Sequence, residues 1–228
     1  MSIADNVARI RERMVEAAVR AGRKDLPKLV AATKTRTADE VRQVILAGVD
    51  ACGENRVQEL TQKLEENAYE GSPLHLIGTL QRNKVKYVVG KTDLIESVNS
   101  VALMDEIEKT AQKLGVTQNV LLEVNLVSEQ SKTGADLALL EQMLEHAASC
   151  ERVRVCGLMA IPPIAPEGST NRPFFAQMYK LFVDTGSKKY DNVKMDMLSM
   201  GMSDDFEDAI MEGALAVRIG TALFGPRG

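Results

Sequence analysis

The sequence is poor in the residues that build disulfide scaffolds and metal sites. Its 228 residues include three cysteines, two histidines and no tryptophan. Cys52, Cys150 and Cys156 are odd in number and have no CxxC spacing, and only His75 and His146 could join them as metal ligands. The sequence therefore predicts neither a disulfide framework nor a zinc site, and we expect three reduced thiols in the core.

The chain also lacks an excess of charge of one sign and any long apolar run. Lys and Arg number 28 against 32 Asp and Glu, a formal net charge of −4, which gives no overall field to attract nucleic acid or an anionic membrane. The N-terminal segment MSIADNVARIRERM has charges every few positions, and no later run approaches the roughly 18–20 apolar residues of a membrane span. We expect a cytoplasmic protein that binds neither nucleic acid nor membranes.

What the chain does contain is a regular alternation of short apolar runs and charged segments with helical spacing. Ser2 is suited to cap an opening helix that reaches Gly22. Eight apolar runs with the pattern of buried parallel strands then follow at residues 28–33, 48–52, 74–78, 93–97, 119–126, 153–161, 193–200 and 216–220. Helical segments are predicted to begin near Ala38, Arg56, Arg82, Ser100, Asp136, Arg172 and Ser203.

This alternation predicts an α/β fold, a single (β/α)8 TIM barrel over residues 1–228 with an extra N-terminal helix. No Pro/Ser-rich linker, low-complexity stretch or change of composition marks a domain boundary. A doubly wound open sheet is the alternative, but it would normally carry a glycine-rich fingerprint after the first strand, and none follows residues 28–33.

Polar residues follow the predicted strands at the end where TIM barrels place their active sites. Reading along the chain, these are Thr33 and Lys34, residues 53–55, Gly78 with Gln81 and Asn83, Glu96 and Ser97, Glu123 and Asn125, Pro162 and Pro163, residues 199–203 and residues 218–221.

Lys34 is a candidate nucleophile because desolvation and neighbouring cations lower the pKa of a lysine at the end of a buried strand. From its position alone, a solvated loop lysine is the simpler interpretation. The turn of Gly220 and Thr221 after the last strand offers N–H groups and a hydroxyl to an anion, as barrels commonly do after strands 7 and 8. Ser199 to Ser203 would form the other side, although Ser203 could equally cap the next helix.

Closure of the barrel would place strand 1 beside strand 8, and so Lys34 beside this anion site. An amine next to a phosphate site fits pyridoxal 5'-phosphate, whose aldehyde and phosphate arm are on adjacent ring carbons. Arg218 could then approach the pyridine nitrogen, where an arginine weakens the ring as an electron sink. The alternative for Arg218 is an ion pair with Glu123 or Asp196.

At these residues the sequence resembles the pyridoxal phosphate homeostasis protein family, which has the fold of the alanine racemase N-terminal barrel. The matching motifs span nearly the whole chain: VAATKTRTADEV (30–41), GENRVQE (53–59), HLIGTLQRNK (75–84), EVN (123–125), KTG (132–134), GLMAIPP (157–163), LSMGMSDDFEDAI (198–210) and VRIGTALFG (217–225).

The resemblance implies that Lys34 forms an internal aldimine, that Ser199, Gly220 and Thr221 hold the phosphate, and that Arg218 faces the pyridine nitrogen. Asn55 is similar to a further cofactor-side residue, and Met200 and Gly201 complete the expected cofactor site. Three positions depart from the usual family pattern in ways that bear on ring packing and loop rigidity: Thr33, Thr37 and Leu74.

The expected function is that of a non-catalytic pyridoxal phosphate carrier, a monomer that buffers the cofactor or delivers it to apo-enzymes. Racemases with a similar barrel have a second, β-rich domain that contributes a tyrosine base, whereas this sequence ends at Arg227 and Gly228 directly after the barrel. The alternative is an amino-acid racemase with Lys34 as its single base. An opposing base is not evident, since all four tyrosines fall in predicted helices or at their ends.

A third hypothesis is an RNA- or phosphate-binding barrel that uses Arg82, Lys84 and Lys86. These residues lie in a short charged helix without interleaved aromatic residues, so a solvated helix face explains them more simply.

Overall fold

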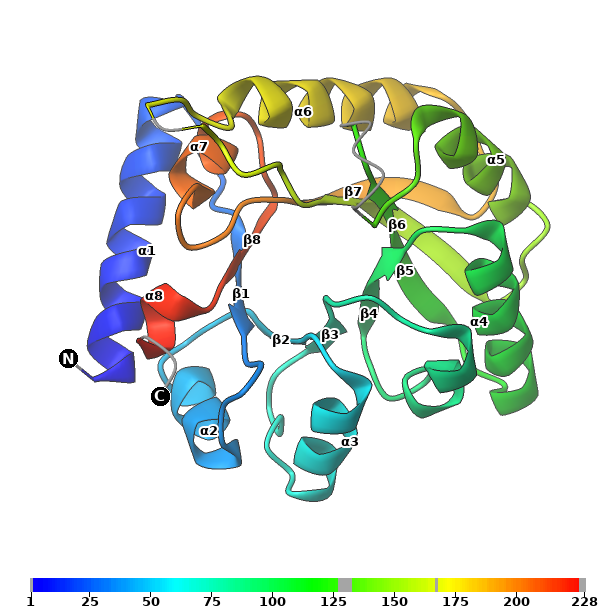
Figure 1. The fold of residues 1–228 in the computed structure, drawn as a ribbon, viewed down its shortest axis with the longest axis horizontal. Helices are drawn as coiled ribbons and strands as arrows, with labels where there is room; N and C mark the ends of the chain where they lie inside the picture. The colour runs from blue at the N-terminus through cyan, green and yellow to red at the C-terminus, as the bar shows by residue number, and fades with distance from the viewer. Residues whose placement is uncertain (1, 127–132, 167, 226–228) are drawn as a thin grey trace.

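The computed structural model describes residues 2–126, 133–166 and 168–225, and its centre is a closed barrel of eight parallel strands in sequence order. Figure 1 shows this ring of strands with the helices arranged around it. The strands are β1 (Lys28–Ala32), β2 (Ala51–Glu54), β3 (Leu74–Leu76), β4 (Leu94–Val98), β5 (Gln118–Val124), β6 (Val153–Ala160), β7 (Val193–Ser199) and β8 (Ala216–Ile219). The predicted TIM barrel is confirmed.

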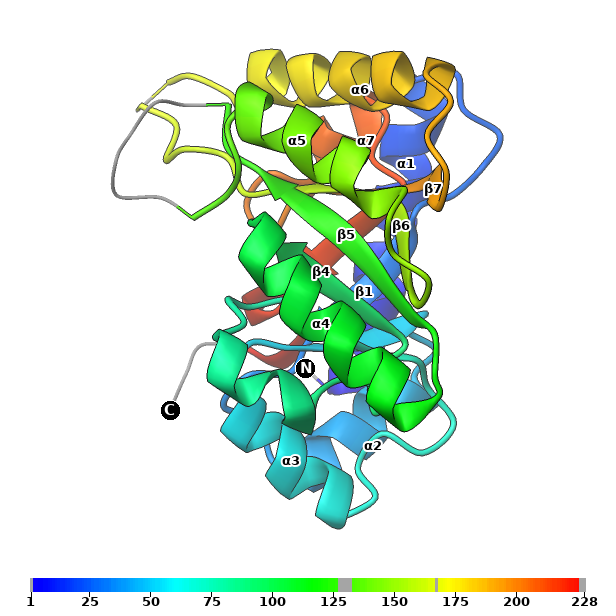
Figure 2. The same cartoon turned by 90° about the vertical axis from the view of Figure 1, so that its right-hand side faces the viewer.

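A helical segment follows each strand, as the apolar spacing indicated. These are α2 (Ala38–Leu46), α3 (Val57–Glu65), the 3-10 helix η1 (Arg82–Tyr87), α4 (Val101–Leu114), α5 (Leu137–Ala147), α6 (Arg172–Ser187), α7 (Phe206–Met211) and α8 (Thr221–Phe224). Figure 2 shows helices α4 and α5 packed beside β5 on the outside of the barrel.

The predicted N-terminal helix is confirmed as α1 (Ile3–Arg20), which precedes the barrel. Ser2 Oγ accepts a hydrogen bond from the amide of Asp5, and the Asp5 carboxylate accepts one from the amide of Ser2. This capping box stabilises the first turn. The apolar side of α1 packs on α7, α8 and α2, close to where the barrel closes (Figure 1).

The barrel closes through the pairing of β1 with β8. The register runs from Lys28 opposite Ala216 to Ala31 opposite Ile219. The carboxyl ends of the two strands are therefore neighbours, and the chain passes from these ends directly into residues 33–35 and 220–221.

The second predicted strand begins later than expected. The apolar spacing placed it at residues 48–52, but β2 covers Ala51–Glu54. Gly48 has a φ of 91° and belongs to the turn that ends α2. Asp50 then uses its side chain in the turn, where its carboxylate accepts a hydrogen bond from the amide of Leu29 at 2.6 Å. The strand begins only after this turn is complete.

The three cysteines are free thiols. Cys52 and Cys150 are buried, as predicted, and burial raises the pKa of each thiol to about 11. Cys156 is partly exposed. Within the described ranges no group of three or more His, Cys, Asp or Glu side chains could hold a metal ion.

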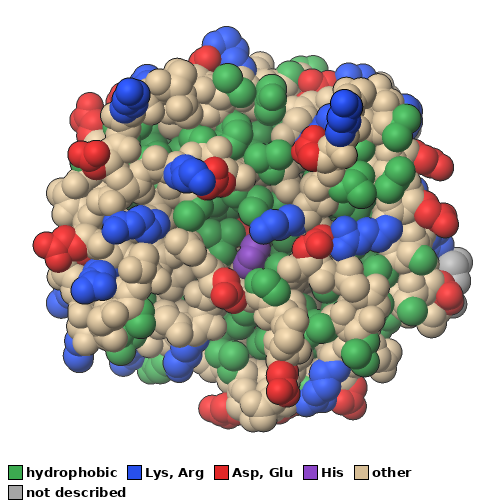
Figure 3. Space-filling view, turned by 180° about the vertical axis from the view of Figure 1, so that it is seen from behind, with side chains coloured by type: hydrophobic (Ala, Val, Ile, Leu, Met, Phe, Trp, Pro, Cys, Tyr) green, Lys and Arg blue, Asp and Glu red, His purple; other side chains and the backbone are tan. Residues whose placement is uncertain are grey.

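None of the described helices has the length and apolar composition needed to span a lipid bilayer. The back of the molecule has acidic and basic side chains interspersed with apolar ones (Figure 3).

Candidate functional site

Lys34 lies at the mouth of the barrel, just after β1, with its side chain half-buried. It lines two cavities, of ≈170 Å³ and ≈420 Å³. We call the smaller one the turn cavity, because the loops after β7 and β8 line it, and the larger one the carboxyl cavity, because Glu123 lines it. Lys34 stands where the two cavities meet.

The turn cavity brings Lys34 together with Arg218, Gly220 and Thr221. These residues are far apart in the sequence and become neighbours because β1 pairs with β8. The remaining lining residues come from the same loops: Ala32, Thr35, Arg36, Met202, Ser203 and Asp204.

Ser203 has a role that differs from the predicted cap of the following helix. Helix α7 begins at Phe206 with Asp205 at its N-cap, so the capping prediction is wrong. The Ser203 hydroxyl instead accepts hydrogen bonds from the amides of Gly220 at 3.3 Å and Ala222 at 3.4 Å. It thereby links the loop after β7 to the turn after β8, and both Ser203 and Gly220 line the turn cavity.

Arg218 is 4% exposed and its guanidinium is held from three sides. It donates to the hydroxyl of Ser199 at 2.8 Å and to the carbonyl of Ala160 at 2.9 Å, and it lies 4.0 Å from Glu96 Oε2. Burial lowers the pKa of Arg218, partly offset by the charge of Glu96.

The alternative interpretation paired Arg218 with Glu123 or Asp196; the charge of Glu123 does act on Arg218, but Asp196 is paired elsewhere. Asp196 pairs with Lys194 at 2.7 Å, on exposed side chains. The acid next to Arg218 is Glu96, which the sequence marked only as a polar residue after the fourth strand. The sequence feature that could have revealed this role of Glu96 is an acid in the short run LIESV, which forms β4 and is buried throughout.

Glu96 connects Arg218 to His75. Its Oε1 lies 2.7 Å from His75 Nδ1, and its Oε2 accepts from the Ser199 hydroxyl at 2.6 Å. Burial acts to raise the pKa of Glu96, but the hydrogen bond and charge of His75, the charge of Arg218 and the Ser199 hydroxyl outweigh it, so the pKa is lowered. His75 is thus a buried histidine with a carboxylate partner.

The predicted site residues Ser199, Met200 and Gly201 are buried and line neither cavity at Lys34. The hydroxyl of Ser199 bridges Arg218 and Glu96, and the carbonyl of Gly201 accepts from the Arg218 amide at 3.0 Å. Gly201 has a φ of 90°, and a Cβ there would lie 2.5 Å from that of Ala209. Ser199 and Gly201 therefore contact Arg218 directly, one at its guanidinium and the other at its backbone amide.

The carboxyl cavity contains two buried oxygen atoms without a hydrogen-bond partner in the described part of the chain. They are Asn55 Oδ1, after β2, and Glu123 Oε2, near the end of β5. A buried oxygen without a hydrogen-bond partner costs free energy. Two such oxygens in residues that line one cavity therefore indicate a binding site for a ligand with hydrogen-bond donors. Asn55 was predicted to face the cofactor, and the structure places it in this cavity with Lys34.

The residues on both sides of Lys34 are anchored to helix α3. The carbonyl of Thr33 accepts from Lys63 Nζ at 2.7 Å, and Lys63 also pairs with the fully buried Glu54. The amide of Thr35, whose φ is 62°, donates to Glu59 Oε2 at 2.6 Å. Because its neighbours are fixed, the backbone of Lys34 has little freedom.

Glu54 is the centre of this anchor. Its Oε1 accepts from the hydroxyls of Thr33 at 2.7 Å and Tyr69 at 3.0 Å, besides Lys63. Burial and the charge of Glu54 raise the pKa of Tyr69 far above its ordinary value. Sequence reasoning missed this cluster, because a lysine is not expected among the buried residues of a helix, although Lys63 follows Val57 and Leu60 at the spacing of the buried face of α3.

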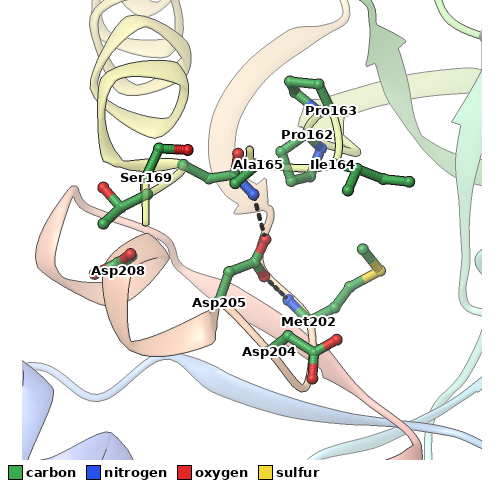
Figure 4. A pocket seen from close by; sticks show the side chains of 11 residues that line it. Pro162, Pro163, Ile164, Ala165, Ser169, Met202, Asp204, Asp205 and Asp208 are labelled. Carbon is green, nitrogen blue, oxygen red and sulfur yellow. Dashed lines mark hydrogen bonds between the residues drawn. The ribbon is translucent and has the colours of Figure 1, made fainter. Parts of the chain in front are cut away.

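A third pocket, of ≈330 Å³, adjoins the turn cavity between the loops after β6 and β7. Figure 4 shows Asp205 at its centre. Its carboxylate accepts from the Asn171 side chain at 2.9 Å and from the Met202 amide at 2.7 Å. The predicted Pro162 and Pro163 line this pocket rather than the cavities at Lys34.

The basic residues of η1 are spread over a short surface turn. Arg82 and Lys86 are exposed, Lys84 is half-buried, and the Lys86 amine lies 5.0 Å from the centre of the Tyr87 ring. Lys132 of the KTG motif, and Arg227 and Gly228 at the chain end, lie outside the described residues.

The closed barrel with its lysine after β1 defines a protein of the alanine racemase barrel class. The family described as "Alanine racemase, N-terminal domain" matches residues 2–228. The pyridoxal phosphate homeostasis protein of Aquifex aeolicus is 42% identical over 228 residues, which cover 100% of this chain and 99% of that protein. The chain belongs to the pyridoxal phosphate homeostasis protein family, as its motifs predicted.

Solved structures agree with this assignment. PipY of Synechococcus elongatus, solved with pyridoxal phosphate bound, is 32% identical with a TM-score of 0.85, and the match covers 98% of this chain and 100% of PipY. Alanine racemase of Clostridium difficile is 18% identical with a TM-score of 0.72, covering 98% of this chain and 57% of the racemase. The second comparison supports the fold alone.

Proposed function

We propose that this protein binds pyridoxal 5'-phosphate through a Schiff base on Lys34 and serves the homeostasis of the cofactor without turning over a substrate. The observation that carries the proposal is the position of Lys34 in two cavities. One is lined by the turn of Gly220 and Thr221, and the other by Asn55 and Glu123, each with a buried oxygen that has no partner among the described residues. The names of the relatives and the pyridoxal phosphate in PipY support the same ligand.

Each part of the site has a role in holding the cofactor. Gly220 and Thr221, tied in place by Ser203, suit the phosphate, since backbone N–H groups and a hydroxyl bind anions. Arg218 suits the pyridine nitrogen. Ser199 holds the guanidinium of Arg218 by a hydrogen bond, and the carbonyl of Gly201 holds its backbone amide, while the Met200 amide pairs with the Ala216 carbonyl on the same strand as Arg218.

When bound, the cofactor supplies an electrophilic aldehyde and a ring that delocalises negative charge. Arg218 limits the second property, because an arginine leaves the pyridine nitrogen unprotonated. Within the described residues, none of Tyr69, Tyr87, Tyr179 and Tyr190 lines either cavity at Lys34. Both observations favour a carrier over an enzyme. We propose that it is a monomer that buffers the cofactor or delivers it to apo-enzymes.

A titration with pyridoxal phosphate, followed by visible absorption, tests the binding. We expect the wild type to take up one equivalent with a visible band, and Lys34→Ala to lose the band. Lys28→Ala is the matched control, because Lys28 is an exposed lysine at the opposite end of the same strand. A variant Lys34→Ala with an unchanged band contradicts the proposal.

A second measurement distinguishes the carrier from the alternative, a racemase that uses Lys34 as its single base. The loaded protein is incubated with single L-amino acids and optical rotation is followed. We expect no racemisation above that of free pyridoxal phosphate. Racemisation that exceeds this background and disappears in Lys34→Ala favours the enzyme.

A further inference from the structure

Glu123 is the most deeply buried acid facing Lys34 across the carboxyl cavity. Glu123 lies near the end of β5 and is 3% exposed. Its Oε1 accepts from the Thr133 hydroxyl at 2.6 Å, whereas its Oε2 is buried and has no hydrogen-bond partner among the described residues. One oxygen is therefore fixed by the protein, and the other is left to interact with what enters the cavity.

A purely structural role does not explain this arrangement. Glu54 also has an unpaired buried oxygen, but its other oxygen accepts from three donors, one of them the cationic Lys63, and it lines neither cavity. Glu123 has one donor among the described residues and lines the cavity of Lys34, and its second oxygen has no hydrogen-bond partner there. An unpaired buried carboxyl oxygen costs free energy that a ligand hydrogen bond would recover.

The chemistry of the cofactor indicates which of its groups lies there. In pyridoxal phosphate the aldehyde carbon is flanked on the ring by the phosphate arm on one side and by a hydroxyl on the other. Lys34 is flanked in the same way, by the turn cavity with Gly220 and by the carboxyl cavity with Glu123. If the phosphate arm enters the turn cavity, the hydroxyl faces the carboxyl cavity.

We propose that Glu123 is a specificity-determining residue that binds the ring hydroxyl of the cofactor, with Thr133 holding its carboxyl group in place. This inference rests on the proposed function, because it requires the cofactor to be joined to Lys34. Glu123 thereby selects pyridoxal phosphate over aldehydes that carry a phosphate arm but no hydroxyl next to the aldehyde.

The protonation of Glu123 is compatible with this role. Burial raises the pKa of Glu123 more than the Thr133 hydrogen bond and the charge of Arg218 lower it. A protonated carboxyl donates to the hydroxyl oxygen and an ionised one accepts from the hydroxyl, so the contact forms in both states.

The test compares pyridoxal phosphate with 3-deoxypyridoxal phosphate, which lacks only the ring hydroxyl. The dissociation constants of both are measured by absorption for the wild type and for Glu123→Ala. For each protein, the preference is the ratio of its dissociation constants for the two ligands. Dividing the preference of the wild type by that of Glu123→Ala cancels any intrinsic difference between the ligands. We expect the preference for the hydroxyl to be at least about tenfold larger in the wild type than in Glu123→Ala.

Two variants make this test specific. Glu123→Gln keeps a hydrogen-bonding group at the same place and should retain most of the preference. Ser97→Ala is the matched control, since Ser97 lines the same cavity but its hydroxyl already donates to the Gly78 carbonyl at 2.7 Å. Circular dichroism checks folding, and Glu123→Leu, which fills a similar space without polar atoms, replaces Glu123→Ala if that variant is unfolded.

The outcomes separate the two proposals. If the wild type binds both ligands and the preference is unchanged in Glu123→Ala, the role of Glu123 is overturned while the proposed function stands. If the wild type binds neither ligand, the proposed function fails and the inference fails with it. A tenfold loss of preference confined to Glu123→Ala and Glu123→Leu supports the inference.

Discussion

The guanidinium of Arg218 donates a hydrogen bond to the hydroxyl of Ser199 on the neighbouring strand at 2.8 Å. That hydroxyl in turn donates to Glu96, which also contacts His75. A chain of hydrogen-bonded side chains thus runs from His75 on β3 to Arg218 on β8, the residue proposed to face the pyridine nitrogen. Such a chain fixes the direction of the guanidinium before any ligand arrives, as preorganised sites require.

The first prediction concerns the bridging hydroxyl. Ser199→Ala leaves a donor of Arg218 and an acceptor of Glu96 without a partner, so we expect the free energy of unfolding to fall by about 1–3 kcal/mol. Urea denaturation measures this. Ser187→Ala, at an exposed serine that bonds to the Asp184 carbonyl, should change stability by less than about 0.5 kcal/mol. Equal effects of the two variants would contradict the prediction.

The second prediction concerns the buried pair of Lys63 and Glu54. Lys63→Met leaves the fully buried Glu54 without its counterion, and breaking such a pair costs about 3–5 kcal/mol of unfolding free energy. Lys188→Met removes a half-exposed pair with Glu141 and should cost about 0–1 kcal/mol. The two free energies come from the same urea titration. Losses of similar size would mean that the Glu54 cluster does not anchor the barrel mouth.

The third prediction concerns the loop that carries Lys34. Glu59→Ala removes the acceptor that holds the Thr35 amide in its left-handed conformation, so the lysine backbone relaxes. We expect the affinity for pyridoxal phosphate to fall about tenfold, because misplacing a reactive group is costly even where folding survives. Glu65→Ala, on the exposed side of the same helix, is the control. A loss of affinity in both variants, or in neither, argues against a positioning role for Glu59.

The fourth prediction concerns pH. The pKa of Glu96 is lowered in the folded protein below that of a glutamate in the unfolded chain, so the folded state binds this proton less readily than the unfolded chain. Its contribution to stability is present above pH ~4.5 and is lost as the pH falls through the folded pKa. We expect the stability of the wild type to fall more steeply below pH ~4.5 than that of Glu96→Gln. Parallel pH profiles of the two proteins would show that Glu96 titrates normally.

The barrel and the meeting of Lys34 with Gly220 and Thr221 could be predicted from the sequence. Both follow from backbone rules: buried parallel strands read as apolar runs, and closure makes the first strand a neighbour of the last. Neither depends on how a particular side chain is oriented. The late start of β2 was missed because the Gly48 turn and the Asp50 side chain interrupt an otherwise apolar run.

The side-chain network of the site could not be predicted in this way. Glu96 contacts Ser199, and through it Arg218, although Glu96 and Ser199 are 103 residues apart in the sequence. Lys63 is a charged residue on the buried face of α3, beside Val57 and Leu60. Ser203 bonds to the turn after β8 rather than to its own helix. Each of these contacts depends on which strands and helices face one another, which a single sequence does not encode locally.

The most direct test of the account is to load the protein with pyridoxal phosphate, reduce it with borohydride and map the labelled peptide by mass spectrometry. Reduction converts a reversible bond to the amine into a permanent one, so the label identifies the lysine that held the cofactor. We predict a single label on Lys34, which disappears in Lys34→Ala and persists in Lys28→Ala. A label on another lysine, or no label on a protein that retains its visible band, would contradict the central claim.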